Sequence, residues 1–303
     1  MVLGTILAGL IPSFLLVALG GLVRRRLSEA GWIGLDRLNF EVLFPALLFT
    51  AAASRPMDLA RVAAIGPAVW AILTLGLVAG YAARRLGPES FLDFAGCWQT
   101  AWRFNTAMGF VAVAVLSRAD AAMMAVAAGM AVPLANIFAV GALSRGGGLG
   151  PWATLRRVAL NPFLLASVAG VLVGLSGWTP PQLVLAPLQM LAQAAIPVAL
   201  VSVGATMDWR ALARFDAFSG VLVGVKLVLL PAATLATCLL LRADPALTQI
   251  LTLFAALPTA SAAHVLAAGF GAERSRAATV VAQSTLLAAL TLPLWIAAAE
   301  FAT

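Results

Sequence analysis

The chain consists of long runs of apolar residues separated by short polar breaks. A helix needs about 20 apolar residues to cross a hydrocarbon core of roughly 30 Å, and ten runs come close to that length or exceed it. They cover residues 3–23, 38–54, 62–83, 91–116, 121–143, 160–177, 183–206, 216–240, 247–269 and 277–299. The pattern therefore predicts an all-α transmembrane fold of ten helices.

The longest polar break divides the chain near its middle. Between Ser144 and Val158 it contains four glycines and Pro151, which are residues that favour turns over helices. We therefore expect a first five-helix repeat over residues 1–143, a cytoplasmic linker over 144–158 and a second five-helix repeat over 159–303.

Part of the second predicted span recurs in the seventh. Residues 44–50 read Phe-Pro-Ala-Leu-Leu-Phe-Thr and residues 196–202 read Ile-Pro-Val-Ala-Leu-Val-Ser, and a Met-Asp pair follows each stretch, Met57-Asp58 and Met207-Asp208. Because each half has an odd number of spans, the second half enters the membrane upside down. Inverted repeats of this kind are typical of secondary transporters, which bind substrate near the midplane at discontinuous helices. The competing interpretation is a chance alignment of Leu-, Ala- and Val-rich segments.

The composition excludes a soluble fold. Hydrophobic residues make up 62% of the chain and charged residues 10%, whereas soluble domains carry about 25% charged residues. The formal net charge of +7 could favour nucleic acid as a partner, but the basic residues are scattered between apolar runs rather than gathered on one face. We interpret them as topology signals instead.

The basic residues are unevenly shared between the two sides of the membrane. The loops after spans 1, 3, 5, 7 and 9 contain thirteen Lys and Arg residues, and the loops after spans 2, 4, 6 and 8 contain four. Cytoplasmic loops retain positive charge. The asymmetry predicts a multi-pass protein of a bacterial inner membrane with both termini in the periplasm.

Motifs for catalysis and cofactor binding are missing from the sequence. It contains no G-x-x-x-x-G-K-[ST], H-E-x-x-H, G-x-S-x-G or C-x-x-C pattern. Cys97 and Cys238 both lie inside apolar segments without a partner spacing, which is typical of buried structural thiols. We therefore expect neither an enzyme nor a bound cofactor or metal.

A polar cluster interrupts the fourth predicted span. It runs from Gln99 to Gly109 and includes Arg103, Asn105 and Thr106. A charged group at the bilayer centre costs roughly 2.5 to 3.5 kcal/mol, so it normally faces a cavity or a partner. Arg103 and Asn105 are separated by about 200° on a regular helix and can face one cavity only if the backbone unwinds. The cluster predicts a broken helix.

The ninth predicted span contains a matching polar break. It includes Pro258, Thr259, Ser261 and His264, the only histidine of the chain. Proline removes a backbone hydrogen bond and frees carbonyl groups that the hydroxyls can help to satisfy. An ordinary proline kink would show the same residues. Opposite the Arg103 and Asn105 cluster in an inverted repeat, however, the break favours a binding site at the midplane.

The charged residues of these two breaks suggest the kind of ligand. Arg103 and the positive ends of half-helices favour an anion such as a carboxylate. The alternative for Arg103 is a structural pair with an acidic residue. His264 is the side chain most readily switched at neutral pH and could carry a proton, or it could be a hydrogen-bonding filler.

Four further polar residues lie within predicted spans. Lys226 in span 8 either extends toward the cytoplasmic face or serves as a buried countercharge. Asn136 in span 5 and Gln283 with Ser284 in span 10 either join helices by hydrogen bonds or support the site.

Several short motifs together resemble the auxin efflux carrier family, the bacterial relatives of the plant PIN proteins. They are residues 38–49 (Leu-Asn-Phe-Glu-Val-Leu-Phe-Pro-Ala-Leu-Leu-Phe), Arg103-Phe104-Asn105-Thr106, Pro258-Thr259-Ala260-Ser261 with Val265-Leu266-Ala267, and Ser284-Thr285-Leu286 with Thr291-Leu292-Pro293. The resemblance covers essentially the whole chain.

The resemblance implies a fold like that of sodium/proton antiporters and bile-acid transporters, with helices 4 and 9 broken where they cross at the substrate site. It also implies a homodimer and elevator-type movement of transport helices 3–5 and 8–10 against scaffold helices 1, 2, 6 and 7. Asn105 matches the family's polar residue at the first crossover and Pro258 the proline of the second. The chain departs from the family at Val111-Ala112-Val113, which lacks a common proline, and at His264 and Glu41.

These observations lead to a functional hypothesis. The chain is expected to be a secondary transporter, an efflux carrier for a small organic anion such as a carboxylate that works by alternating access. One alternative is a sodium- or proton-coupled symporter of the same fold. A second, of another class, is a membrane receptor or scaffold that transports nothing.

Overall fold

A computed structural model describes residues 2–53, 59–113, 116–117, 119, 121–206, 209 and 215–303. Every regular element in these ranges is helical: α1 (Val2–Val23), α2 (Glu29–Leu38), α3 (Phe44–Ala53), α4 (Leu59–Gly80), α5 (Phe91–Trp98), α6 (Thr106–Val113), α7 (Ala121–Gly146), α8 (Pro151–Ala159), α9 (Pro162–Ser176), α10 (Gln182–Thr206), α11 (Ala217–Gly224), α12 (Leu230–Leu240), α13 (Pro245–Ala256), α14 (Ala262–Gly269) and α15 (Arg274–Ala302). The repeated pairs Met57-Asp58 and Met207-Asp208 lie outside the described residues.

Long apolar helices dominate the fold, as the hydropathy pattern predicts. Among the described residues, five helical stretches are long and apolar enough to cross a membrane: Val62–Arg85, Met123–Gly146, Gln182–Ala205, Ala217–Leu240 and Arg274–Ala302. A sixth results if α8 and α9, which meet at a bend of 50°, form one span. The prediction of an all-α protein with membrane-spanning helices is confirmed at this level.

Polar residues in the breaks between apolar runs cap the helices. Ser28 accepts a hydrogen bond from the Gly31 amide at the start of α2, and Asp216 accepts one from Ser219 at the start of α11. At α9, Asn161 caps the helix and is followed directly by a proline. These side chains satisfy backbone N–H groups that a helix leaves unpaired at its first turn.

Two helices contain a π-helical segment just before a proline. Asn39–Leu43 joins α2 to α3 ahead of Pro45, and Val225–Leu229 joins α11 to α12 ahead of Pro231. Proline cannot donate a backbone hydrogen bond, and a local π-helical turn is one way to carry a helix past the missing bond. In the described chain the predicted spans 38–54 and 216–240 are therefore continuous helices with an inserted turn.

The predicted linker is partly helical. α7 continues to Gly146, and α8 begins at Pro151 within the glycine-rich break. Proline suits the first turn of a helix, where its missing N–H is not needed, and Arg156 and Arg157 lie favourably in the last turn. No residue of α8 is buried, and Trp152 is 79% exposed.

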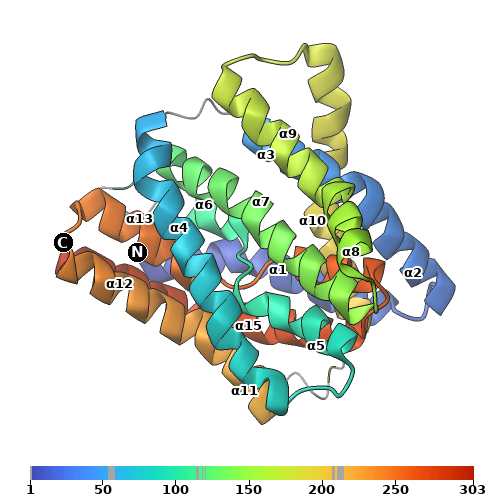
Figure 1. The fold of residues 1–303 in the computed structure, drawn as a ribbon. Coiled ribbons are helices and arrows are strands. Elements are labelled where there is room, and N and C mark those ends of the chain that lie inside the picture. Colours follow the sequence, from blue (N-terminus) through green and yellow to red (C-terminus); the bar gives the residue numbers. More distant parts are fainter. Residues whose placement is uncertain are drawn as a thin grey trace.

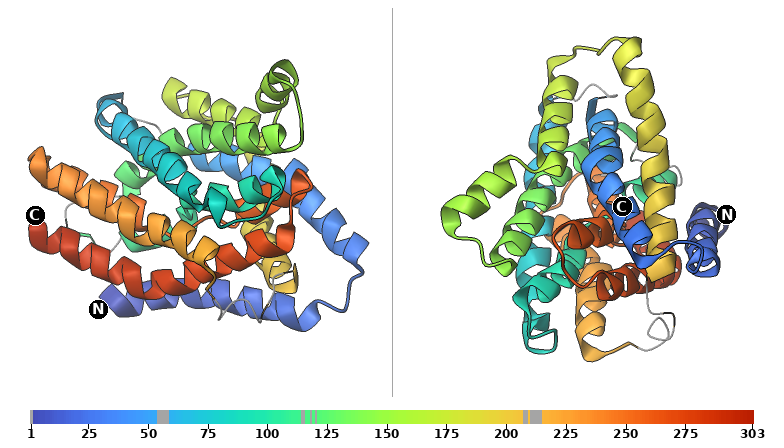
Figure 2. Two further views of the ribbon diagram at one scale, coloured as in Figure 1. Left: turned by 60° about the horizontal axis from the view of Figure 1, so that its bottom comes forward. Right: turned by 90° about the vertical axis from the view of Figure 1, so that its right-hand side faces the viewer.

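The helices pack as two groups. In one, α1 lies along α10, and α3 packs between α9 and α10. In the other, α4 and α5 pack on α7, and α13 packs on α12 and α15. Figures 1 and 2 show α9 and α10 on one side of the molecule and α11 and α12 on another, with both chain termini at the same end.

Glycines allow the closest helix contact in the first group. A Cβ added to Gly204 of α10 would lie 1.8 Å from the Val17 carbonyl oxygen of α1, and one added to Gly20 would lie 2.0 Å from the Val201 carbonyl oxygen. Small residues at such positions let helix backbones approach each other in a membrane. The two helices are therefore in backbone contact.

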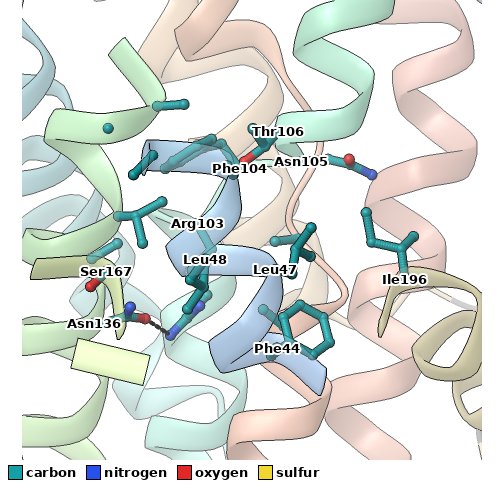
Figure 3. A pocket seen from close by; sticks show the side chains of 18 of the residues that line it. Phe44, Leu47, Leu48, Arg103, Phe104, Asn105, Thr106, Asn136, Ser167 and Ile196 are labelled. Carbon is teal, nitrogen blue, oxygen red and sulfur yellow. Dashed lines mark hydrogen bonds between the residues drawn. The ribbon is translucent and has the colours of Figure 1, made fainter. Parts of the chain in front are cut away.

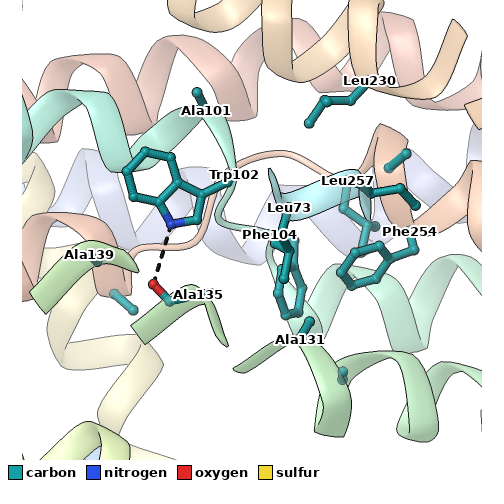
Figure 4. Packing of buried hydrophobic residues seen from close by; sticks show 14 of the residues in the cluster. Leu73, Ala101, Trp102, Phe104, Ala131, Ala135, Ala139, Leu230, Phe254 and Leu257 are labelled. Atoms are coloured by element: carbon teal, nitrogen blue, oxygen red, sulfur yellow. Dashed lines mark hydrogen bonds between the residues drawn. The ribbon is translucent and has the colours of Figure 1, made fainter. Parts of the chain in front are cut away.

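The core of the second group surrounds the end of the α5 segment. Figure 4 shows Trp102 and Phe104 among Leu73, Phe254 and Leu257. The Phe104 and Phe254 rings have centroids 4.4 Å apart, and the indole N–H of Trp102 donates to the Ala135 carbonyl at 3.3 Å. This packing holds the non-helical residues after α5 in a defined place.

Candidate functional site at two helix breaks

Two interrupted helices meet inside the protein. α5 ends at Trp98, continues as a 3₁₀ turn over Gln99–Ala101 and resumes as α6 at Thr106. α13 ends at Ala256, and α14 begins at Ala262. The amide N–H of Asn105 in the first break donates to the carbonyl of Pro258 in the second at 2.8 Å. Both predicted breaks are present, and they touch.

Polar side chains around the crossing satisfy backbone groups of both breaks. Gln99 donates through Nε2 to the Ala263 carbonyl at 3.0 Å, and the Asn105 side-chain oxygen accepts from the Met108 amide at 3.1 Å. In the second break, the Thr259 amide donates to Ser284 Oγ at 3.1 Å. Unwound backbone is tolerated at membrane depth only where such partners exist. The crossing is thus a built structure rather than a local kink.

A pocket of about 200 Å³ adjoins the crossing. Its walls come from both helix groups: α3, α9 and α10 on one side, and the two breaks with α6, α7 and α14 on the other. Most of the lining is apolar, including Phe44, Leu47 and Leu48 (Figure 3). The polar lining residues are Arg103, Asn105, Thr106, Asn136, Ser167 and Ser261.

Arg103 lies in the wall of this pocket and is buried, with an exposed fraction of 5%. Its Nε donates to Gln99 Oε1 at 2.8 Å, and its Nη2 donates to Asn136 Oδ1 at 2.9 Å. Both partners are neutral amides. Among the described residues, these hydrogen bonds hold the guanidinium in place and leave its positive charge uncompensated.

The structure brings together six of the residues predicted for the site. Arg103, Asn105, Thr106, Asn136 and Ser261 all line the pocket, and the Pro258 carbonyl binds Asn105 beside it. Because the chain unwinds between Trp102 and Asn105, the angular separation expected on a regular helix does not apply, and Arg103 and Asn105 reach the same cavity.

Other predicted residues lie behind the pocket. The Thr259 side chain is buried away from the lining, and Ser284 of α15 supports its backbone. Gln283 is buried on the same helix. Lys226, whose exposed fraction is 2%, donates through Nζ to the Ala255 carbonyl at 3.0 Å. Of its two expected roles, the buried one matches this position, because the ammonium faces the C-terminal end of α13.

His264 does not line the pocket. Its imidazole is fully buried and lies beside Asp36 of α2 and Ser202 of α10, with Nε2 3.5 Å from Asp36 Oδ2. His264 lies three residues after the pocket-lining Ser261, and its side chain contacts α2 and α10 instead of the pocket. In this structure it belongs to a separate polar cluster.

Sequence reasoning missed several residues of these networks. Gln99 links Arg103 to the second break, Ser167 lines the pocket, and Asp36 and Arg274 surround His264. Gln99 begins the polar cluster predicted in the fourth span, and Asp36 is an acid two residues before a predicted span. Nothing in the sequence distinguishes Ser167 from the other residues of its span.

Within the described part of the chain, no group of three or more His, Cys, Asp or Glu residues is placed to hold a metal ion. Cys97 and Cys238 are each buried and not joined by a disulfide.

Known proteins resemble this chain over both halves. Residues 152–296 match a family model described as "Membrane transport protein". A "Putative malonate transporter" of Rhizobium meliloti (strain 1021) is 29% identical over 295 residues, which cover 93% of this chain and 92% of that protein. An "Uncharacterized transporter" of Methanothermobacter thermautotrophicus is 28% identical over 141 residues, 46% of each chain. These similarities support the resemblance drawn from the motifs: the chain is similar to membrane transporters of the auxin efflux carrier family.

Proposed function

We propose that the protein carries a small organic anion, such as a mono- or dicarboxylate, across the bacterial inner membrane by alternating access. The observation that supports this most strongly is the Arg103 guanidinium in the pocket wall, held by two neutral amides. A carboxylate entering the pocket would compensate that charge. Charge-assisted hydrogen bonds to a guanidinium are among the stronger interactions that a protein can offer a carboxylate.

The two short helices beside the pocket favour the same ligand charge. α6 begins at Thr106 and α14 at Ala262, both of them pocket-lining residues. Helix N-termini carry partial positive charge and bind anions well. The pocket is smaller than the roughly 300 to 1,000 Å³ of sites for drug-sized ligands, which suits a small substrate. The R. meliloti relative is named as a malonate transporter, and malonate is accordingly the first candidate.

The arrangement of the helices supports an elevator mechanism. The group containing α1, α3, α9 and α10 corresponds to the proposed scaffold, and the group containing the two breaks to the proposed transport helices. The pocket lies between the two groups, so that sliding one past the other would carry a bound anion. We infer ten spans in two inverted repeats, a homodimer, and periplasmic termini, with export or exchange as the direction of transport.

Two alternatives differ from this proposal in testable ways. A sodium- or proton-coupled symporter would use the same pocket but require a cation gradient. A membrane receptor or scaffold that transports nothing would need no crossing of two unwound segments, and the contact between Asn105 and Pro258 argues against it.

Ligand binding to the purified protein tests the substrate class. Malonate and other mono- and dicarboxylates are expected to raise the thermal stability of the protein in detergent, whereas sugars and cationic amines have no effect. A ligand at 100 times its Kd contributes about 2.7 kcal/mol to stability. In Asn105→Ala, we expect the affinity for malonate to fall by at least about tenfold, since a polar pocket contact and the cap of α6 are both lost.

Asn161→Ala provides a matched control. Asn161 also caps a helix, accepting from the Phe163 amide at 2.9 Å, but it does not line the pocket. Its loss should cost about 1 kcal/mol of stability and leave the malonate affinity unchanged. If no carboxylate stabilises the protein, or if Asn105→Ala binds malonate as tightly as Asn161→Ala, the proposed site is wrong.

A further inference from the structure

A buried cluster of charged residues lies outside the pocket. His264 of α14 and Asp36 of α2 have exposed fractions of 0% and 2%. The imidazole Nε2 is 3.5 Å from Asp36 Oδ2 and 3.4 Å from Ser202 Oγ, and Nδ1 is 3.2 Å from the Arg274 carbonyl oxygen. Ser202 donates its hydroxyl proton to Asp36 Oδ1. Residues of α2, α10 and α15 thus converge on His264 of α14.

The neighbours of the imidazole determine which form of the ring fits there. A carboxylate and a backbone carbonyl only accept hydrogen bonds, and the Ser202 proton already points to Asp36. Both ring nitrogens of His264 therefore face acceptors. A ring with protons on Nδ1 and Nε2 satisfies both contacts, whereas a neutral ring turns one nitrogen lone pair toward an oxygen lone pair. The acceptors around the ring favour the protonated imidazolium.

The surrounding charges are balanced when His264 is protonated. Arg274 approaches Asp36 Oδ2 at 3.4 Å through Nη1 and Glu29 Oε1 at 3.8 Å through Nη2, so two acids face Arg274 and His264.

Other charged groups on or near the elements that pack against α14 contact partners outside this cluster. On α5, Asp93 accepts a hydrogen bond from the amide of Glu273. In the π-helical segment, Glu41 is exposed and pairs with Arg37. Arg157 stacks on Phe270, at the end of α14.

The cluster also joins the two helix groups. Asp36 lies on α2 and Ser202 on α10, which packs with α1 and α3. His264 lies on α14, whose first residue, Ala262, lines the pocket. Moving α14 relative to α2 would separate buried charges of opposite sign, which is costly unless one of them is neutralised. Loss of the His264 proton to water would weaken this contact.

We propose that His264 and Asp36 form a proton-binding site, separate from the anion pocket, that holds α14 against α2 and α10 when protonated and releases it when the proton leaves. This inference rests on the proposed transport function for its physiological role: movement of the transport helices is then linked to proton binding and release.

Two measurements test the site, one of which needs no substrate. In wild-type protein in detergent, hydrogen exchange of the amides of α14, corrected for the intrinsic rate, should become faster as the pH is raised and the imidazole loses its proton. In His264→Gln, protection of α14 should not change with pH. In proteoliposomes, malonate entry through the wild type should slow as the pH is lowered and the contact forms, whereas entry through His264→Gln should not depend on pH.

Further variants and outcomes make the interpretation unambiguous. Asp36→Asn should behave as His264→Gln does, and it replaces His264→Gln in both measurements if the histidine variant fails to fold. Ser202→Ala keeps both titratable groups and should retain the pH response. An unchanged pH response of α14 in both His264→Gln and Asp36→Asn would overturn the proton site, whether or not malonate is transported. Absence of any carboxylate transport in the wild type would instead count against the proposed function alone.

Discussion

Arg103→Met should reduce malonate transport by roughly 10- to 150-fold while leaving a folded, monodisperse protein. The expected size follows from the loss of a charged hydrogen-bond donor worth about 1.5 to 3 kcal/mol to a bound carboxylate. Methionine fills much of the same volume, so the packing around Trp102 and Phe104 should persist. Initial rates of labelled malonate uptake into proteoliposomes measure the effect.

Arg103→Lys is the informative comparison for that result. Lysine keeps the positive charge but cannot reach Gln99 and Asn136 with the planar donor pair of a guanidinium. Its uptake rate should therefore lie between those of the wild type and Arg103→Met. Uptake by a well-folded Arg103→Met protein at the wild-type rate would show that the pocket charge plays no part in anion transport.

Transport should not require sodium, and Lys226→Met should reduce it by at least about tenfold. In sodium-coupled carriers, unwound carbonyls and half-helix C-termini coordinate the ion. Here the Lys226 ammonium donates to the Ala255 carbonyl at the C-terminal end of α13, beside the second break. The amino group of Lys226 already occupies this position. Its removal leaves a buried carbonyl without its charged donor, at a cost of about 1 to 3 kcal/mol.

Replacing sodium with choline during malonate uptake checks the first part, and Lys226→Arg provides the control for the second. Arginine preserves the charge and should retain more transport than methionine. A strict sodium requirement in the wild type would contradict the role assigned to Lys226 and would favour the sodium-coupled alternative.

Much of the fold could be predicted from the sequence because each apolar run is long and its ends are polar. Helices are present in every predicted span, and Pro258 and the Arg103–Asn105 spacing correctly indicated two broken helices. Gly146 to Gly150 suggested a plain linker, but Pro151 starts the short helix α8. The proline at its first turn was compatible with either outcome.

The site was less predictable because it depends on contacts between distant segments. Phe44, Leu47 and Leu48 line the pocket, yet nothing distinguishes them in the sequence from the other apolar residues of α3. His264 was noticed as a lone histidine near a break, but its neighbours Asp36 and Ser202 lie on α2 and α10. A one-dimensional pattern does not contain the packing of α14 against these helices.

Counterflow of malonate measures the central claim, that a small carboxylate crosses the membrane through the pocket between the two helix breaks. Proteoliposomes loaded with unlabelled malonate are diluted into a trace of labelled malonate, without any ion gradient. We predict a transient accumulation of label in the wild type and in Asn161→Ala that is strongly reduced in Arg103→Met and Asn105→Ala. No accumulation above protein-free liposomes, for malonate or any other carboxylate tested, would contradict the account.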